Sequence, residues 1–213
     1  MKAIVIGDIH GKVEVVKAAL ARPEKKIFVG DFFDSYDKSS EECIEAMTLV
    51  VEAIEQGENV LTCVGNHELS YYAPGMTCSG FDRNTFNSFH DSGLVERWRK
   101  VSSYYIWEQG VLITHAGLTN KLGPFNSPEE VKAFLTSSDK LTNIGYSRGG
   151  RSLVGGIFWC DISEFAPISS VPQVFGHSRG GPHEVGNSIG IDCLDTVGLV
   201  VAIENGELSI ETL

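Results

Sequence analysis

Short apolar runs and amphipathic segments alternate along the first third of the chain. The runs Ala3–Gly7, Lys26–Gly30 and Asn59–Gly65 each have the length and composition of a buried strand. Between them, Val13–Arg22 and Glu41–Gln56 repeat apolar residues at steps of three and four, which predicts helices. Strands that alternate with helices indicate a parallel sheet with helices on its faces.

The rest of the chain has a different pattern. Two segments, about 71–105 and 119–170, lack clean periodicity and are expected to be irregular insertions, apart from a helix over Pro128–Thr136. Apolar runs predict strands at Tyr104–Trp107 and Val111–Thr114. We therefore expect one α/β domain over residues 1–213.

The C-terminal part, from Val174 onward, predicts short strands joined by tight turns. The pairs Gly186-Asn187 and Asn205-Gly206 separate these strands, and Asn-Gly is typical of a two-residue hairpin turn. Helices early and hairpins late indicate two packed mixed sheets flanked by helices.

Composition excludes several classes of protein. The 213 residues are 42% hydrophobic, so the chain can bury a core, and no apolar run approaches the ~20 residues of a membrane span. The charge of −11 disfavours general binding to nucleic acid. Five scattered cysteines without a CxxC pair indicate reduced thiols and a cytoplasmic location.

Polar residues that can bind metal follow five of the apolar runs. Since ligands bind beyond the carboxyl ends of parallel strands, these loops are expected to converge on one crevice. The candidate ligands are Asp8, His10, Asp31, Asn66, His115 and His177, with His67 and Asp34 beside them. Mixed imidazole and oxygen ligands favour two transition-metal ions, with Mn first and Fe or Zn as alternatives. A two-metal site suits displacement at phosphorus.

The motifs GDIHG, GDFFD, GNHE, HAG and GHS occur in that order, and the first three start about 23 and 35 residues apart. This set resembles the calcineurin-like metallophosphoesterases. Within them it is most similar to the phosphoprotein phosphatase branch and its small bacterial and bacteriophage serine/threonine phosphatases. The resemblance implies the calcineurin-like fold, a dimetal site at the C-terminal ends of strands, and a metal-dependent phosphatase.

The resemblance also implies a role for each candidate. Asp8, His10 and His177 would bind one metal, Asn66 and His115 the other, and Asp31 would bridge the two. The nucleophile would be a metal-bridging hydroxide. His67 would be the general acid and Asp34 would hydrogen-bond to it, although Asp34 could instead cap the helix that follows.

One departure concerns substrate phosphate. The phosphatase branch continues GDxxD with Arg-Gly, but this chain has Ser35-Tyr36 there. A replacement is expected from Arg148 or Arg151 in a Gly-rich loop, because a guanidinium can donate two bonds to phosphate; Arg179 is a further candidate. Asp192 resembles a late Asp that supports the ligands.

Three hypotheses about function remain open. The first is a phosphomonoesterase acting on a phosphoprotein or a small phosphoester. The second is a nucleotide phosphohydrolase similar to diadenosine tetraphosphatases, and the third is a binding module without turnover. The aromatic residues after GNHE, Tyr71 among them, are expected to pack the insertion, while His90 and His183 are expected on the surface or in loops.

Overall fold

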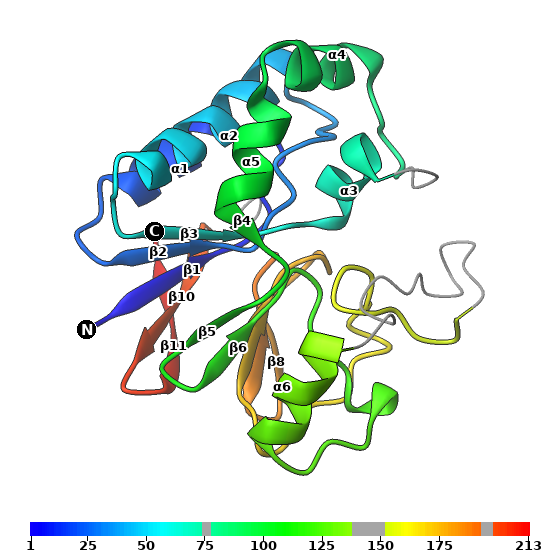
Figure 1. Cartoon of the computed structure of the whole chain (residues 1–213). Helices are drawn as coiled ribbons and strands as arrows, with labels where there is room; N and C mark the ends of the chain where they lie inside the picture. The colour runs from blue at the N-terminus through cyan, green and yellow to red at the C-terminus, as the bar shows by residue number, and fades with distance from the viewer. Residues whose placement is uncertain (74–77, 138–151, 193–197) are drawn as a thin grey trace.

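We describe the fold from a computed structural model. The described residues are 1–73, 78–137, 152–192 and 198–213. Arg148 and Arg151 therefore lie outside the described residues. The elements form two sheets with helices outside them, as the sequence predicts (Figure 1).

The first sheet has six strands in the order β11-β10-β1-β2-β3-β4. Its parallel part consists of four strands: β1 (Ala3–Ile6), β2 (Lys25–Phe28), β3 (Val60–Cys63) and β4 (Ser102–Ser103). The C-terminal hairpin of β10 (Leu199–Glu204) and β11 (Glu207–Thr212) adds to the free edge of β1, antiparallel to it. Asn205 and Gly206 both have positive φ, which confirms the predicted hairpin turn.

The second sheet has five strands in the order β5-β6-β7-β9-β8. They are β5 (Ile106–Glu108), β6 (Val111–Ile113), β7 (Gln173–Phe175), β8 (His183–Val185) and β9 (Ser188–Gly190). The neighbours β6, β7 and β9 are parallel, and the edge strands β5 and β8 are antiparallel to their partners. Both sheets are mixed, as predicted.

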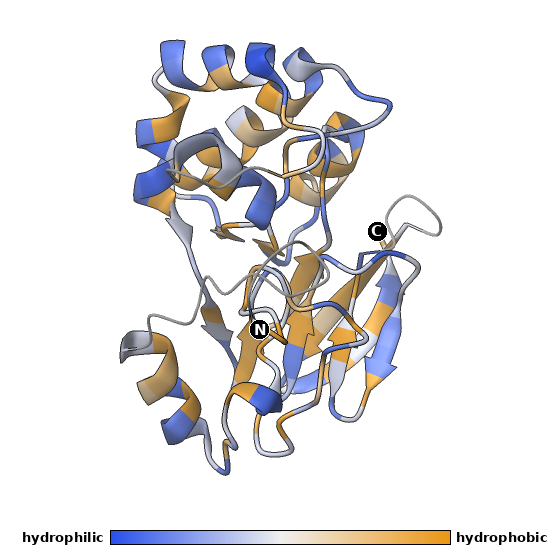
Figure 2. Cartoon of the chain, turned by 90° about the vertical axis from the view of Figure 1, so that its right-hand side faces the viewer, coloured by the Kyte–Doolittle hydropathy of each residue, from blue (hydrophilic) through white to orange (hydrophobic). Residues whose placement is uncertain are grey.

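Alternation along the strands separates two cores. In β1, Ala3 and Val5 pack between the sheets, while Ile4 and Ile6 face the helices. The helix layer over the first sheet contains α1 (Val13–Leu20), α2 (Ser40–Glu55), α4 (Arg83–Asp91) and α5 (Leu94–Val101). The central strands are mostly hydrophobic in Figure 2, whereas the helices carry both hydrophilic and hydrophobic sides.

The expectation of an irregular segment over 71–105 is wrong for its described residues. It holds α4 and α5 and the end of α3 (Asn66–Tyr72), and α5 buries Leu94, Val95 and Trp98 against the first sheet. Trp98 contacts Phe32 edge-on at 5.3 Å, so this layer supports the loop that follows β2. Polar residues dominate α4 and hide its periodicity in the sequence, but its Phe89 is fully buried.

The described residues of the segment 119–170, which are 119–137 and 152–170, fit the expectation more closely. Its helix α6 (Pro128–Ser137) ends one residue beyond the predicted range, and a short 3-10 helix covers Asn120–Leu122. The helix packs Val131 and Leu135 on the outer side of the second sheet. No helix in the described part of the chain is long and apolar enough to cross a membrane.

Candidate metal centre

Five loops at the ends of strands meet in one pocket of about 260 Å³. The pocket lies where β1, β2 and β7 end, so parallel strands of both sheets deliver their polar residues to the same edge. Its lining comprises Asp8, His10, Asp31, Asp34, Tyr36, His67, Ser79, His177, Arg179 and Asp192. Asn66 and His115 are buried, and both contact the lining residue His177.

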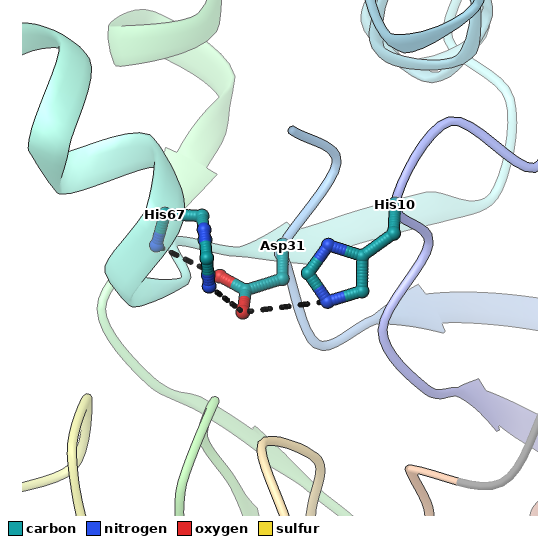
Figure 3. Close-up of side chains that lie close together, drawn as sticks. All are labelled: His10, Asp31 and His67. Atoms are coloured by element: carbon teal, nitrogen blue, oxygen red, sulfur yellow. Dashed lines mark hydrogen bonds and ion pairs between the residues drawn. The ribbon is translucent and has the colours of Figure 1, made fainter. Parts of the chain in front are cut away.

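Asp31 stands at the centre of the polar cluster. Its Oδ2 lies 3.3 Å from His115 Nε2, 3.8 Å from His67 Nε2 and 4.0 Å from His10 Nε2. Figure 3 shows the carboxylate between His67, at the start of α3, and His10, in the loop after β1. The other oxygen, Oδ1, accepts the backbone N–H of His67 at 3.0 Å.

Two histidines direct their Nε2 atoms toward this cluster. The Nδ1 of His10 lies 2.6 Å from the carbonyl oxygen of Phe33, and the Nδ1 of His115 lies 3.1 Å from that of Val29. A carbonyl oxygen only accepts, so in each neutral ring Nδ1 carries the proton and Nε2 keeps its lone pair. Both Nε2 atoms then face the carboxylate of Asp31, which also only accepts. Such a group of acceptors needs protons or metal cations between them.

The pKa values also indicate that this cluster of acceptors needs protons or metal cations. Burial lowers the pKa of His115, but the negative charge of Asp31 outweighs it and raises the pKa to about 9. Burial raises the pKa of Asp31, but the neighbouring histidines, His115 foremost, lower it well below its usual range. For His10 burial dominates and lowers the pKa to about 4, so this ring is neutral and its Nε2 lone pair is available to a metal ion.

The donor atoms form two groups that share Asp31. The ligating atoms of His10, Asp31 and His67 lie within 4.8 Å of one another, and so do those of Asp31, His115 and His177. The groups fit two divalent cations with Asp31 between them, and mixed N and O donors are typical of transition metals. Asp8 lines the same pocket but belongs to neither group.

The position of His177 differs from the expectation. The sequence placed it with Asp8 and His10, but its Nδ1 lies 3.3 Å from His115 Nε2 and 3.0 Å from Asn66 Oδ1. Its link to Asp8 runs through the backbone, because the His177 N–H donates to both carboxylate oxygens of Asp8 at 3.0 Å. The geometry therefore groups the His177 side chain with Asn66 and His115.

His67 and Asp34 form a pair at the wall of the pocket. The Nδ1 of His67 lies 2.7 Å from Asp34 Oδ2, and the Asp34 side chain has no exposed surface. Burial lowers the pKa of His67, but Asp31 and Asp34 overcome this and raise it to about 9. The helix cap that the sequence left open for Asp34 falls instead on Ser39, which caps α2.

Backbone strain and close approach are concentrated here. Among the described non-glycine residues, six have positive φ, and four of these are the candidates His10, Asp31, Asp34 and His177. Such conformations cost about 1–3 kcal/mol each and cluster at functional sites. A Cβ at Gly65 would collide with the Asp31 carboxylate, which explains the glycine of GNHE.

Sequence reasoning missed two residues of this region. The buried carboxylate of Glu68 accepts backbone N–H groups from Gly65, Asp31 and Phe32 at 2.6–2.9 Å, and thereby joins α3 to the loop after β2. The hydroxyl of Tyr71 donates to Asp34 Oδ1. The Glu of GNHE was a visible signal for the first, whereas nothing local indicated the second.

Neither remaining histidine lines the pocket. His90 is part of α4, half-buried, and its Nε2 lies 2.8 Å from the carbonyl oxygen of Tyr71, so it is not the loop or surface residue expected. His183 belongs to β8 and is also half-buried. Asp192 is 7% exposed and lines the pocket, where burial and the charge of Asp31 raise its pKa.

Comparisons with known proteins agree with this geometry. The family model of the calcineurin-like phosphoesterases matches residues 1–199. The chain belongs to the calcineurin-like phosphoesterase family. It is therefore a metal-dependent hydrolase of phosphoric esters, and its family implies bound divalent metal ions. No curated protein sequence matches the chain.

Solved structures share the calcineurin-like phosphoesterase fold with the chain. A cold-active protein-tyrosine phosphatase from a psychrophilic Shewanella species is 16% identical, with a TM-score of 0.62 over 100% of this chain and 80% of that one. A yeast protein serine/threonine phosphatase with similarity to human phosphatase PP5, from Saccharomyces cerevisiae, is 16% identical, with a TM-score of 0.58 over 99% and 79%. At this identity the likeness is one of fold.

Proposed function

We propose that the chain is a dinuclear phosphomonoesterase of the protein serine/threonine phosphatase type. The His67–Asp34 pair beside the Asp31 cluster is the observation that carries this proposal. It places a protonated imidazole, His67, within the cluster whose other members would hold metal. Phosphate esters with poor leaving groups need such a proton donor, because an alkoxide leaves only slowly without protonation.

Each residue of the pocket would have a separate role in metal binding or proton transfer. His10, Asp31 and Asp8 would hold one metal ion, and Asn66, His115 and His177 with Asp31 would hold the other. The bound metals, most simply Mn, would supply an activated water and neutralise charge on the phosphoryl oxygens. Asp34 keeps the Nδ1 proton of His67 directed toward itself. The Nε2 proton of His67 is then free to move to the leaving oxygen.

Arg179 supports recognition of a phosphate group. It is exposed on the loop after β7, lines the pocket, and its guanidinium lies 5.3 Å from the ring centre of Tyr36 on the opposite loop. Ser35-Tyr36 stands where the phosphatase branch has Arg-Gly, and Arg179 would instead bring a cation to the pocket from the loop after β7. Arg148 and Arg151 stay candidates from the sequence.

A nucleotide phosphohydrolase is the second candidate. Tyr36 is 79% exposed at the pocket mouth, and an exposed aromatic ring beside a cation can stack on a nucleobase. The phosphoprotein substrate is favoured because the ordered set of motifs resembles the phosphatase branch most, even though Ser35-Tyr36 replaces its Arg-Gly and His115-Ala116-Gly117 replaces its HGG.

Substrate preference and two variants test the proposal. With added Mn, we expect phosphate release from phosphoserine peptides to exceed hydrolysis of diadenosine tetraphosphate. We expect His67→Ala to lower kcat by about 10²–10⁴ while metal content is kept. Asp31→Asn should lose both metal and turnover, and exposed Asp37→Asn is the control. Preference for the dinucleotide would select the second candidate, and full activity of His67→Ala would reject the mechanism.

A further inference from the structure

Tyr71 occupies a position that links α3 to the catalytic pair. It follows His67 by one helical turn, so both side chains leave the same face of α3. The side chain is 1% exposed, which alone would fit an aromatic core residue. Its hydroxyl, however, meets a buried carboxylate, because it donates to Asp34 Oδ1. Asp34 is thus held at both oxygens, since Oδ2 faces His67 Nδ1 at 2.7 Å.

The direction of this hydrogen bond is fixed by a third group. The backbone N–H of Asp82 donates to Tyr71 Oη at 3.0 Å. A phenol has a single proton, so once its oxygen accepts from Asp82 that proton is left for Asp34. The ring itself is wedged between Phe33, at 4.9 Å, and Phe81, which stacks on it at 4.8 Å. Tyr71 therefore cannot swing away from Asp34 without disturbing its surroundings.

We propose that Tyr71 is a positioning residue of the phosphoester reaction. Its hydroxyl fixes the orientation of the Asp34 carboxylate, and Asp34 in turn orients the His67 ring. The inference rests on the proposed role of His67 as proton donor. A buried carboxylate oxygen without a partner is costly, so removal of the Tyr71 hydroxyl lets Asp34 rotate toward other donors. The His67 ring then loses its fixed orientation, although no group that touches the substrate has been changed.

Tyr71→Phe in the full-length protein loaded with Mn tests this role. We compare kcat and KM for a phosphoserine peptide, which has a poor leaving group, with those for 2,4-dinitrophenyl phosphate, which has a good one. We expect kcat for the peptide to fall about tenfold with KM nearly unchanged, and kcat for the aryl ester to change less than about twofold. A proton donor matters only where the leaving oxygen is basic. Tyr72→Phe is the matched control, because Tyr72 lies one residue further along α3 and is half-buried.

His67→Gln, assayed alongside, separates this inference from the proposed function. One outcome is that His67→Gln lowers kcat for the peptide much more than kcat for the aryl ester, while Tyr71→Phe lowers the two equally or not at all. In that case the role of Tyr71 is wrong while the mechanism stands. If His67→Gln lowers both substrates equally or neither, the proposed mechanism fails, and the role of Tyr71 falls with it.

A double-mutant cycle distinguishes positioning from general loss of packing. If Tyr71 acts through Asp34, Tyr71→Phe should have little further effect on peptide turnover in the Asp34→Asn background. Equal losses from Tyr71→Phe in both backgrounds would overturn the inference. So would an equal fall in kcat for the two substrates.

Discussion

Individual side chains in this pocket acquire their chemistry from their immediate partners. His10 and His67 both have a ring nitrogen within 4.0 Å of the Asp31 carboxylate, yet their pKa values move in opposite directions. For His10 burial prevails, whereas a second carboxylate, Asp34, contacts His67 directly and helps to raise its pKa. The His10 ring is thereby neutral and can give a lone pair to a metal ion, whereas the His67 ring carries a proton.

Asp34→Asn should lower the pKa of His67 in the metal-free protein. The wild-type value of about 9 depends on negative charge near the ring, and the amide keeps the shape of Asp34 without that charge. Titration of the imidazole signals by NMR measures the change, with Asp37→Asn as the control at an exposed acidic residue. An unchanged pKa would show that Asp34 does not tune His67.

Metal binding at pH 7.5 should release protons. In the metal-free protein His115 has a pKa of about 9 and is mainly protonated at that pH, but a metal ligand must be deprotonated. Apparent affinity for Mn should therefore rise between pH 7 and pH 9 and level off above that range. Calorimetry in two buffers of different ionisation enthalpy counts the protons, and a result without proton release would contradict the assignment of His115.

Secondary-structure elements fix which residues can meet. The loop after β2 and the start of α3 are joined by three backbone N–H groups that donate to Glu68. This clamp holds Asp31 beside Gly65 and His67, although Asp31 lies far from them in sequence. The burial of Glu68 and the charge of Asp31 raise the pKa of Glu68 to about 7.

Glu68→Gln should destabilise the protein by about 1–3 kcal/mol, because one amide nitrogen would then face backbone donors without an acceptor. Urea unfolding followed by circular dichroism gives the free energy of unfolding, and exposed Glu52→Gln serves as the control. If the two variants were equally stable, the clamp would carry no net stability.

The sequence predicted the elements that have strong periodicity and missed those that depend on distant partners. The strands and helices of the first third are confirmed with shifts of one or two residues, because their apolar patterns match the helical and strand periods. By contrast, α4 has mostly polar residues and is held by its contact with α2 and α5. The regular pattern of α5 was hidden within a polar segment.

The same limit applies to the site. Donor residues at the ends of strands could be found, because the topology of a parallel sheet gathers them. The grouping of His177 and the contact of Tyr71 with Asp34 could not, because both depend on side-chain directions between segments far apart in the chain.

Across the whole molecule, the two sheets and the helix layer converge on one pocket. The chain is acidic overall, with a charge of −11, and a pocket lined by Asp8, Asp31, Asp34 and Asp192 would repel a phosphate. Two divalent cations would reverse the sign of the local field, so substrate attraction depends on metal loading. Long polyanions stay disfavoured by the surface, whereas a compact phosphate ester can enter.

Phosphate affinity should therefore depend on metal. We expect inorganic phosphate to inhibit or bind the Mn-loaded protein and to show at least about tenfold weaker binding after metal removal by chelation. Calorimetric titration of phosphate into both forms measures the difference, with chloride at the same ionic strength as the control. Equal affinity of the two forms would show that metal does not create the anion site.

A crystal structure of the Mn-loaded protein, with anomalous scattering data collected above the Mn absorption edge, tests the dimetal centre most directly. We predict two anomalous peaks about 3.5–4 Å apart, with Asp31 between them, His10 at one, and Asn66, His115 and His177 at the other. A single peak, or peaks away from Asp31, would contradict the two-metal mechanism.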